Sequence, residues 1–259
     1  MTTNAMDAIA AFSVKINGTA LTKAEADQVQ EVVVEQSLHL PHMFVIRIND
    51  SKTSEDSAAT MFGMTDADKF PIGASIEILM GWGSTTATVM KGEVTGIELD
   101  VLPDGTPGLT VRGYAKSHRL HRGRKTRSFQ SKKDSDIVST IAGEAGLTAS
   151  ATTTSETYDW LYQVNQTNWE FLRERAARLG YEMWVDDTKL YFRPAQDGST
   201  TGPTLKYMED LASFRVRVSS QGQPTAVEVR GWDVKTKAAL VGSASTGSGE
   251  PAIALGKTA

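Results

Sequence analysis

The chain has 259 residues, 40% of them hydrophobic and 22% charged, which is the composition of an ordinary globular protein with one large or two modest domains. Its net charge of −4 argues against binding nucleic acid by overall charge, and the absence of cysteine excludes disulfides, thiol catalysis and thiolate metal sites. No run reaches the roughly 18 apolar residues that cross a bilayer, and the start of the chain lacks the basic and apolar regions of a signal peptide. We therefore expect no membrane span, and synthesis in the cytoplasm without a signal peptide.

Antiparallel strands are predicted throughout residues 1–115. Apolar and polar residues alternate, or β-branched residues cluster, at residues 12–17, 29–36, 43–49, 76–80, 86–101 and 109–114. Asn17-Gly18 suits a two-residue hairpin turn, Pro103-Asp104-Gly105 suits another turn, and a short helical turn is expected at residues 58–62. Because these strands follow one another without a long helix, they predict a closed or nearly closed antiparallel barrel.

Residues 116–133 form a basic stretch without a single acidic residue. Its members are Lys116, Arg119, Arg122, Arg124, Lys125, Arg127, Lys132 and Lys133, together with His118 and His121. One interpretation is a solvated edge that resists aggregation, and an equally weighted one is contact with an acidic partner such as a neighbouring subunit. Stable nucleic-acid binding is disfavoured because Phe129 is the single aromatic residue in the stretch. The predicted interaction residues are Arg119, Arg122, Arg124, Lys125 and Arg127.

The pair His118 and His121 has a spacing that could serve a metal on a helix. This segment is predicted to end a strand, where residues three apart face in opposite directions, and no third ligand lies nearby. We therefore predict no metal site.

A short helix is predicted after the basic stretch, with Asp134 or Ser135 as its N-cap and Gly146 after its end. Its apolar face comprises Ile137, Val138, Ile141 and Ala145. Residues 148–157 are rich in threonine and are predicted to be a polar connector.

Residues 158–193 carry the strongest local signal, a strand, a capped helix and a hairpin. Thr167 and Glu170 have the spacing of a capping box, and Gly180 suits the left-handed position after a helix. The predicted core of this signature element is Trp169, Leu172, Gly180 and Tyr181. The hairpin turns at Asp186-Asp187, and Trp184 is out of phase with its apolar neighbours, which favours a subunit interface for that side chain.

The last part of the chain is predicted to hold fewer strands. Residues 211–218 and 224–231 read as an alternating pair around Gly222, and residues 242–259 are a small, polar, Gly/Ser-rich tail or linker. We thus expect a mainly β (α+β) fold, in which two antiparallel β-barrel-like domains flank a small α/β insertion. The expected divisions are residues 1–115, 116–200, 201–241 and 242–259.

Catalytic motifs are not found: the sequence has no nucleophile elbow, zinc-protease motif, phosphate-binding loop or dinucleotide fingerprint. We therefore expect no enzymatic activity, no catalytic residues and no cofactor. The alternative is a carbohydrate- or peptidoglycan-active β module, in which an acid pair acts with tryptophans. Its candidate tryptophans are Trp82, Trp160, Trp169, Trp184 and Trp232. Such a module would function as a monomer.

The stretch YDWLYQVNQTNWEFLRERAARLGYEMWVDDTKLYFR resembles the central hub proteins of contractile injection machines. These are the phage late control protein D family and the N-terminal hub region of VgrG-like spike proteins. Residues 12–50 and the sequence AVEVRGWD at residues 226–233 extend the resemblance over most of the chain.

The resemblance implies a homotrimeric ring of two similar barrels per subunit, which adapts a sixfold tail tube to a threefold spike. Its implied partners are tail tube or baseplate proteins, a spike domain or protein, and effector cargo, within an assembled phage-tail-like particle. It also implies strands that the second β region lacks, so this chain is either a reduced hub or part of a longer protein.

Overall fold

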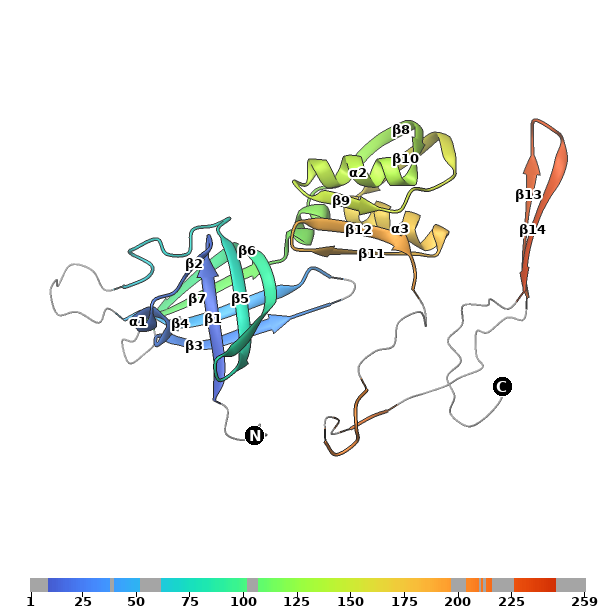
Figure 1. Ribbon diagram of the computed structural model, residues 1–259. Helices are drawn as coiled ribbons and strands as arrows, with labels where there is room; N and C mark the ends of the chain where they lie inside the picture. Colours follow the sequence, from blue (N-terminus) through green and yellow to red (C-terminus); the bar gives the residue numbers. More distant parts are fainter. Residues whose placement is uncertain are drawn as a thin grey trace. The chain divides into compact units, whose positions relative to one another are not determined.

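The computed structural model describes residues 9–37, 40–51, 62–101, 107–196, 204–209, 211, 213–215 and 226–245. It divides into two compact units, Met1–Pro194 and Ala195–Ala259 (Figure 1). Most of the secondary structure is strand, so the predicted β-rich fold is confirmed. No described helix is long and apolar enough to cross a membrane.

The first unit begins with a seven-stranded antiparallel sheet. Its strands are β1 (Ala10–Ile16), β2 (Thr19–Ala20), β3 (Val29–Glu35), β4 (Met43–Asn49), β5 (Ser75–Trp82), β6 (Thr85–Val101) and β7 (Pro107–Tyr114), and helix α1 (Lys23–Ala26) lies between β2 and β3. All six strands predicted in this region are present. The turn at Asn17 and Gly18 has the expected positive φ angles of 49° and 85°.

The described strands form an open sheet, so a fully closed barrel, one of the two arrangements predicted, is wrong. The strand order of the sheet is β2-β1-β5-β6-β7-β4-β3, which leaves β2 and β3 at the two ends. Strand β2 is two residues long and pairs with Lys15 and Ile16 alone, so most of β1 has no hydrogen-bonded neighbour on that side among the described residues. Closure needs continuous pairing around the ring, and the described strands do not supply it between β1 and β3.

Alternating residues of the sheet build the first core. Val14, Ile46, Ile78 and Val111 are buried on four different strands and belong to one apolar cluster. The predicted helical turn at residues 58–62 lies outside the described residues except for Phe62, which bridges to Ser51. The predicted turn at residues 103–105 also lies outside them.

The same unit continues with an α/β region around a second core. Its elements are the 3-10 helix η2 (Lys116–His121), β8 (Lys125–Lys133), α2 (Asp134–Glu144), β9 (Thr148–Ala151), β10 (Thr157–Gln166), α3 (Asn168–Leu179), β11 (Tyr181–Asp186) and β12 (Lys189–Pro194). Strands β8 and β10 pair antiparallel, while β11, β12 and β9 form a three-stranded sheet in which β9 runs parallel to β12. In Figure 1, helices α2 and α3 lie alongside these strands.

Two predictions in this region fail. Helix α2 has Lys133 as its N-cap, where the Asp136 carboxylate accepts a hydrogen bond from the Lys133 amide at 3.2 Å, so neither Asp134 nor Ser135 is the cap. Residues 148–151 form β9 instead of a connector. Ala149 and Ala151 are small, so they pack on the second core without the bulky alternation that predicts a strand.

The signature element folds as predicted. The Thr167 hydroxyl accepts from the Glu170 amide at 3.1 Å, and the Glu170 carboxylate accepts from the Thr167 amide at 2.9 Å, which completes the capping box of α3. Gly180 ends the helix with a φ of 64°, a left-handed conformation that glycine adopts without steric cost.

The second unit contains the antiparallel hairpin of β13 (Ala226–Asp233) and β14 (Ala238–Ser245). Residues 224–231 were predicted to pair with 211–218, and half of the latter segment lies outside the described residues; the observed neighbour of β13 along its whole length is β14. Strand β14 also extends into the predicted tail as far as Ser245. The described part of this unit contains no further strand, so the second barrel is not seen there.

Candidate functional site

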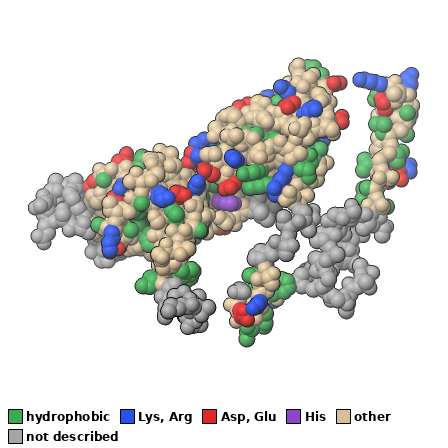
Figure 2. All heavy atoms as spheres, viewed as in Figure 1, with side chains coloured by type: hydrophobic (Ala, Val, Ile, Leu, Met, Phe, Trp, Pro, Cys, Tyr) green, Lys and Arg blue, Asp and Glu red, His purple; other side chains and the backbone are tan. Residues whose placement is uncertain are grey.

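The basic stretch at residues 116–133 is the strongest candidate from sequence, and it folds as η2 and β8. Figure 2 shows blue and red side chains interspersed over the visible surface of the first unit, with no single basic patch. The individual contacts explain this, because four of the eight lysine and arginine side chains of the stretch form ion pairs with acidic residues of other elements.

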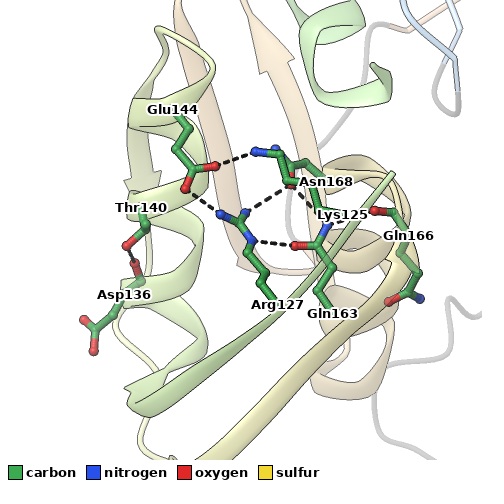
Figure 3. Close-up of polar contacts among 8 residues, drawn as sticks. All are labelled: Lys125, Arg127, Asp136, Thr140, Glu144, Gln163, Gln166 and Asn168. Atoms are coloured by element: carbon green, nitrogen blue, oxygen red, sulfur yellow. Dashed lines mark hydrogen bonds and ion pairs between the residues drawn. The ribbon is translucent and has the colours of Figure 1, made fainter. Parts of the chain in front are cut away.

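Arg127 on β8 is the centre of a polar network (Figure 3). Its guanidinium donates to Gln163 Oε1 at 2.8 Å, to Glu144 Oε1 at 2.5 Å and to Asn168 Oδ1 at 3.2 Å. These three partners lie on β10, α2 and α3, so one arginine connects four elements. Gln163 is fully buried, and its amide also donates to Asn168 at 3.2 Å.

Glu144, near the end of α2, forms ion pairs with two basic side chains. Lys125 Nζ donates to Glu144 Oε2 at 2.8 Å, beside the bond from Arg127. Burial acts to raise the pKa of Glu144, but the hydrogen bonds from Arg127 and Lys125 outweigh it and hold that pKa below its ordinary value. The carboxylate therefore stays charged at neutral pH.

Arg119 on η2 joins the first sheet to the α/β region. Its guanidinium makes a two-point contact with the Glu93 carboxylate on β6, with Arg119 Nε to Glu93 Oε2 at 3.0 Å. It also donates to the carbonyl of Ala145 at 3.0 Å, at the end of α2. A second link is the ion pair between Lys91 and Asp187 at 3.1 Å. Both links lie within the first unit.

Arg124 completes the set of paired candidates. It donates to the carbonyl of Asn165 at 2.6 Å and to the Glu170 carboxylate at 3.0 Å. Four of the five predicted basic interaction residues thus form ion pairs with carboxylates of their own chain. Among the described residues, Arg122 forms no ion pair, and neither do Lys116, Lys132 and Lys133 of the same stretch.

His118 and His121 lie on a 3-10 helix, so the prediction that they face in opposite directions is wrong. Residues three apart on such a helix lie above one another. His118 Nδ1 lies 2.9 Å from the carbonyl of Ala115, and the His121 ring stacks on Trp169 with centroids 4.8 Å apart. Burial lowers the pKa of both imidazoles. The described residues include no group of three side chains able to hold a metal ion.

Trp184, the remaining interaction candidate, is half-buried in an aromatic stack on the β11–β12 hairpin. The ring of Tyr191 lies parallel to it at 4.6 Å, and the guanidinium of Arg193 lies over it at 4.6 Å. Arg193 in turn donates to Glu182 at 2.7 Å. The out-of-phase tryptophan is therefore explained by cross-strand stacking within the hairpin.

Of the four predicted signature residues, Trp169 and Leu172 belong to the second core and Tyr181 packs against it. Trp169 and Leu172 are buried, and Gly180 ends α3. Tyr181 is half-buried, with its ring 5.1 Å from that of Phe192.

A buried ion pair that was not predicted from the sequence patterns joins Arg175 to Asp134. Arg175 Nε and Nη2 donate to the two Asp134 oxygens at 2.6 and 3.0 Å, and the guanidinium lies 4.6 Å from the Tyr158 ring centroid. Arg175 is 4% exposed and Asp134 is 1% exposed. A signal existed, because Arg175 lies beside Ala176 and three residues after Leu172, on the apolar face of α3.

Comparison with known proteins gives one family and a consistent set of folds. The family model described as the Alg8 N-terminal domain matches residues 6–252. This is a different model from the late control protein D family that the sequence resembles. No curated protein matches the chain.

Two of the similar solved structures are tail proteins. The prophage MuSo2 43 kDa tail protein from Shewanella oneidensis is 14% identical with a TM-score of 0.63, covering 92% of this chain and 69% of that one. The tail protein from Neisseria meningitidis MC58 is 15% identical with a TM-score of 0.56, covering 95% and 69%. A chain of the Francisella PdpA–VgrG complex is 8% identical with a TM-score of 0.50, covering 86% and 34%. This chain therefore has the fold of phage tail proteins.

Proposed function

The chain belongs to the family described as the Alg8 N-terminal domain, and we propose that it is a structural hub of a contractile, phage-tail-like injection machine. The observation that carries the proposal is the tail-protein fold, which extends over 92% and 95% of the chain in two comparisons. In this proposal the role is structural, and the strand-rich domains present surfaces to partner proteins.

In this proposal three copies form a ring that adapts the sixfold tail tube to the threefold spike. Among the described residues, the outer edge of β3 and most of the outer edge of β1 have no strand neighbour, which supports association, because an exposed strand edge can accept another chain. Further support comes from Ile97, Leu99 and Val101, which alternate along the far part of β6 and remain exposed. Such apolar residues are expected to be covered in an assembly.

The surface for partners also includes the basic residues of the stretch that form no ion pair with another described residue, Lys116, Arg122, Lys132 and Lys133. We assign these four to contact with an acidic neighbour or with the channel. The tube or baseplate, the spike and effector cargo are the proposed partners, within an assembled tail-like particle.

The mass of the purified protein, measured by light scattering after size exclusion over a concentration series, tests the trimer. The expected species has a mass of about 84 kDa, three times the 28.0 kDa of the chain. Val101→Asp, which adds a charge to the exposed apolar row, should shift the protein toward the monomer. Asp100→Asn, at the neighbouring exposed position, is the matched control and should leave the mass unchanged.

A glycan-binding module remains the competing function, because Trp160 and Tyr162 on β10 are 56% and 61% exposed. A monomer at every concentration that binds cell-wall glycans, and loses this binding in Trp160→Ala, would favour that function over the hub. A monomer that forms rings once tube or spike protein is added would support the hub.

A further inference from the structure

We propose that a cavity beside η2 binds a carboxylate group carried on an apolar stem. The cavity has a volume of about 510 Å³, which is within the range of small-ligand sites. It lies where the ends of β3, β4 and β7 meet η2. This inference goes beyond the hub function and does not depend on the oligomeric state.

The walls of the cavity are mainly apolar. Leu40 and Pro41, which precede β4, line the cavity together with Met43 at the start of β4. Tyr114 lines it from the end of β7. Leu40 is 65% exposed, so water contacts an apolar surface that a ligand stem could cover. Removing such surface from water is favourable for any apolar group that fits.

The polar groups of the cavity select an anion. Arg122, His118 and His121 all line it, and Arg122 is the one arginine of the basic stretch whose charge meets no carboxylate within the described residues. A guanidinium matches the two oxygens of a carboxylate with two parallel hydrogen bonds. Arg119, by contrast, already holds Glu93, so it is not free for a ligand.

Charged groups near the two imidazoles affect their protonation. Arg122 and, more weakly, Arg119 disfavour the protonated form of His118, while Glu93 favours it. His121 lies in the field of Glu170 and His118. Glu35 also lines the cavity, and it is the one carboxylate among the lining residues. A bound carboxylate would offset the unpaired positive charge of Arg122.

Binding should be linked to proton uptake. The acceptor facing His118 Nδ1 is the Ala115 carbonyl, so this nitrogen carries the hydrogen and Nε2 of the neutral ring has none to donate. Only the protonated ring can donate from Nε2 to a carboxylate. His121 Nε2 is buried and has no hydrogen-bond partner among the described residues. Burial lowers the pKa of both imidazoles in the unbound chain, so affinity is expected to rise as the pH falls below the ordinary imidazole pKa of about 6.5.

Titration calorimetry of the full chain tests the site with two carboxylate sources. The probes are octanoate and a short peptide ending in leucine with a free carboxylate, and their controls are octanol and the same peptide with an amidated end. Binding of octanoate alone identifies a free acid as the source, and binding of the peptide identifies a protein C-terminus. Either result, with its neutral control at least about tenfold weaker, supports the proposal.

Three variants make the assignment specific. Arg122→Gln should weaken binding about tenfold or more, as expected for lost hydrogen bonds to a charged group. Arg173→Gln on α3, an exposed arginine whose loss changes the net charge equally, should have no effect. His118→Gln should flatten the pH dependence, and circular dichroism checks that it remains folded.

Other results overturn the proposal. These are equal affinity in Arg122→Gln and Arg173→Gln, equal binding of the neutral controls, an affinity that does not change with pH, or no binding of either carboxylate at millimolar concentration.

Discussion

The buried ion pair of Arg175 and Asp134 gives the sharpest stability prediction. Arg175→Met replaces the guanidinium by an apolar side chain and leaves the Asp134 carboxylate without its two hydrogen bonds of 2.6 and 3.0 Å. Both groups are at least nine-tenths buried, so water cannot replace the lost partner. Removal of one partner of a buried pair typically costs about 3–5 kcal/mol.

Two features place the expected loss at the lower end of this range. Asp134 is the first residue of α2, where the helix dipole favours a negative charge. The Met side chain also keeps an apolar contact with the Tyr158 ring, which the guanidinium now covers. We therefore expect Arg175→Met to lower the free energy of unfolding by about 3 kcal/mol.

Urea unfolding, followed by circular dichroism, measures this loss. Arg173→Met on the same helix is exposed and should change stability by less than about 0.5 kcal/mol. The double variant Asp134→Asn with Arg175→Met should be more stable than Arg175→Met alone, because it no longer buries an uncompensated charge. A loss below about 1 kcal/mol in Arg175→Met, or a double variant whose loss is the sum of the two single losses, would refute the reasoning.

Three further changes have defined outcomes. Because the folded pKa of Glu144 is lowered, its stabilisation is present above the ordinary value of 4.5 and is lost as the pH falls through the folded pKa. Glu144→Gln should therefore cost about 0.5–1 kcal/mol at pH 7 and lose less stability between pH 5 and 3 in acid titrations of the unfolding midpoint. The folded pKa of His121 is also lowered, by burial, so folding is weakened as the pH falls below about 6.5. His121→Gln should flatten this part of the thermal stability profile, and an unchanged profile would contradict the assignment. Gly113→Ala places a Cβ against the Glu93 carbonyl and the Phe44 ring, and should cost about 3 kcal/mol by denaturant unfolding. Gly143→Ala in α2, where a Cβ meets nothing, is its control and should stabilise by up to about 1 kcal/mol.

Local chemistry explains which parts of the fold could be predicted. The capping box of α3 and the left-handed Gly180 depend on residues within one or two turns, so their spacing is visible in the sequence. The strands of the first sheet could be predicted because their apolar and polar residues alternate or their β-branched residues cluster. Strand β9 is four residues long and small in side-chain volume, so it carries no such signal.

Partners that are distant in the chain could not be predicted. The sequence of the basic stretch suggests an unpaired surface because its acidic partners lie far away in the chain. Glu170 is 46 positions from Arg124, and Glu93 is 26 positions from Arg119. The partner of β13 was missed for a related reason, since β14 is rich in alanine, glycine and serine and resembles a linker. Full closure of the first sheet could not be predicted either, because the alternation of apolar and polar residues does not show whether the two end strands pair with each other.

The number of copies in an assembled particle tests the hub most directly. Quantitative mass spectrometry of purified tail-like particles can count this chain against the tube protein. The hub proposal predicts three copies per particle, whatever the length of the tail. Absence from the particle, or a copy number that grows with tail length, would contradict it.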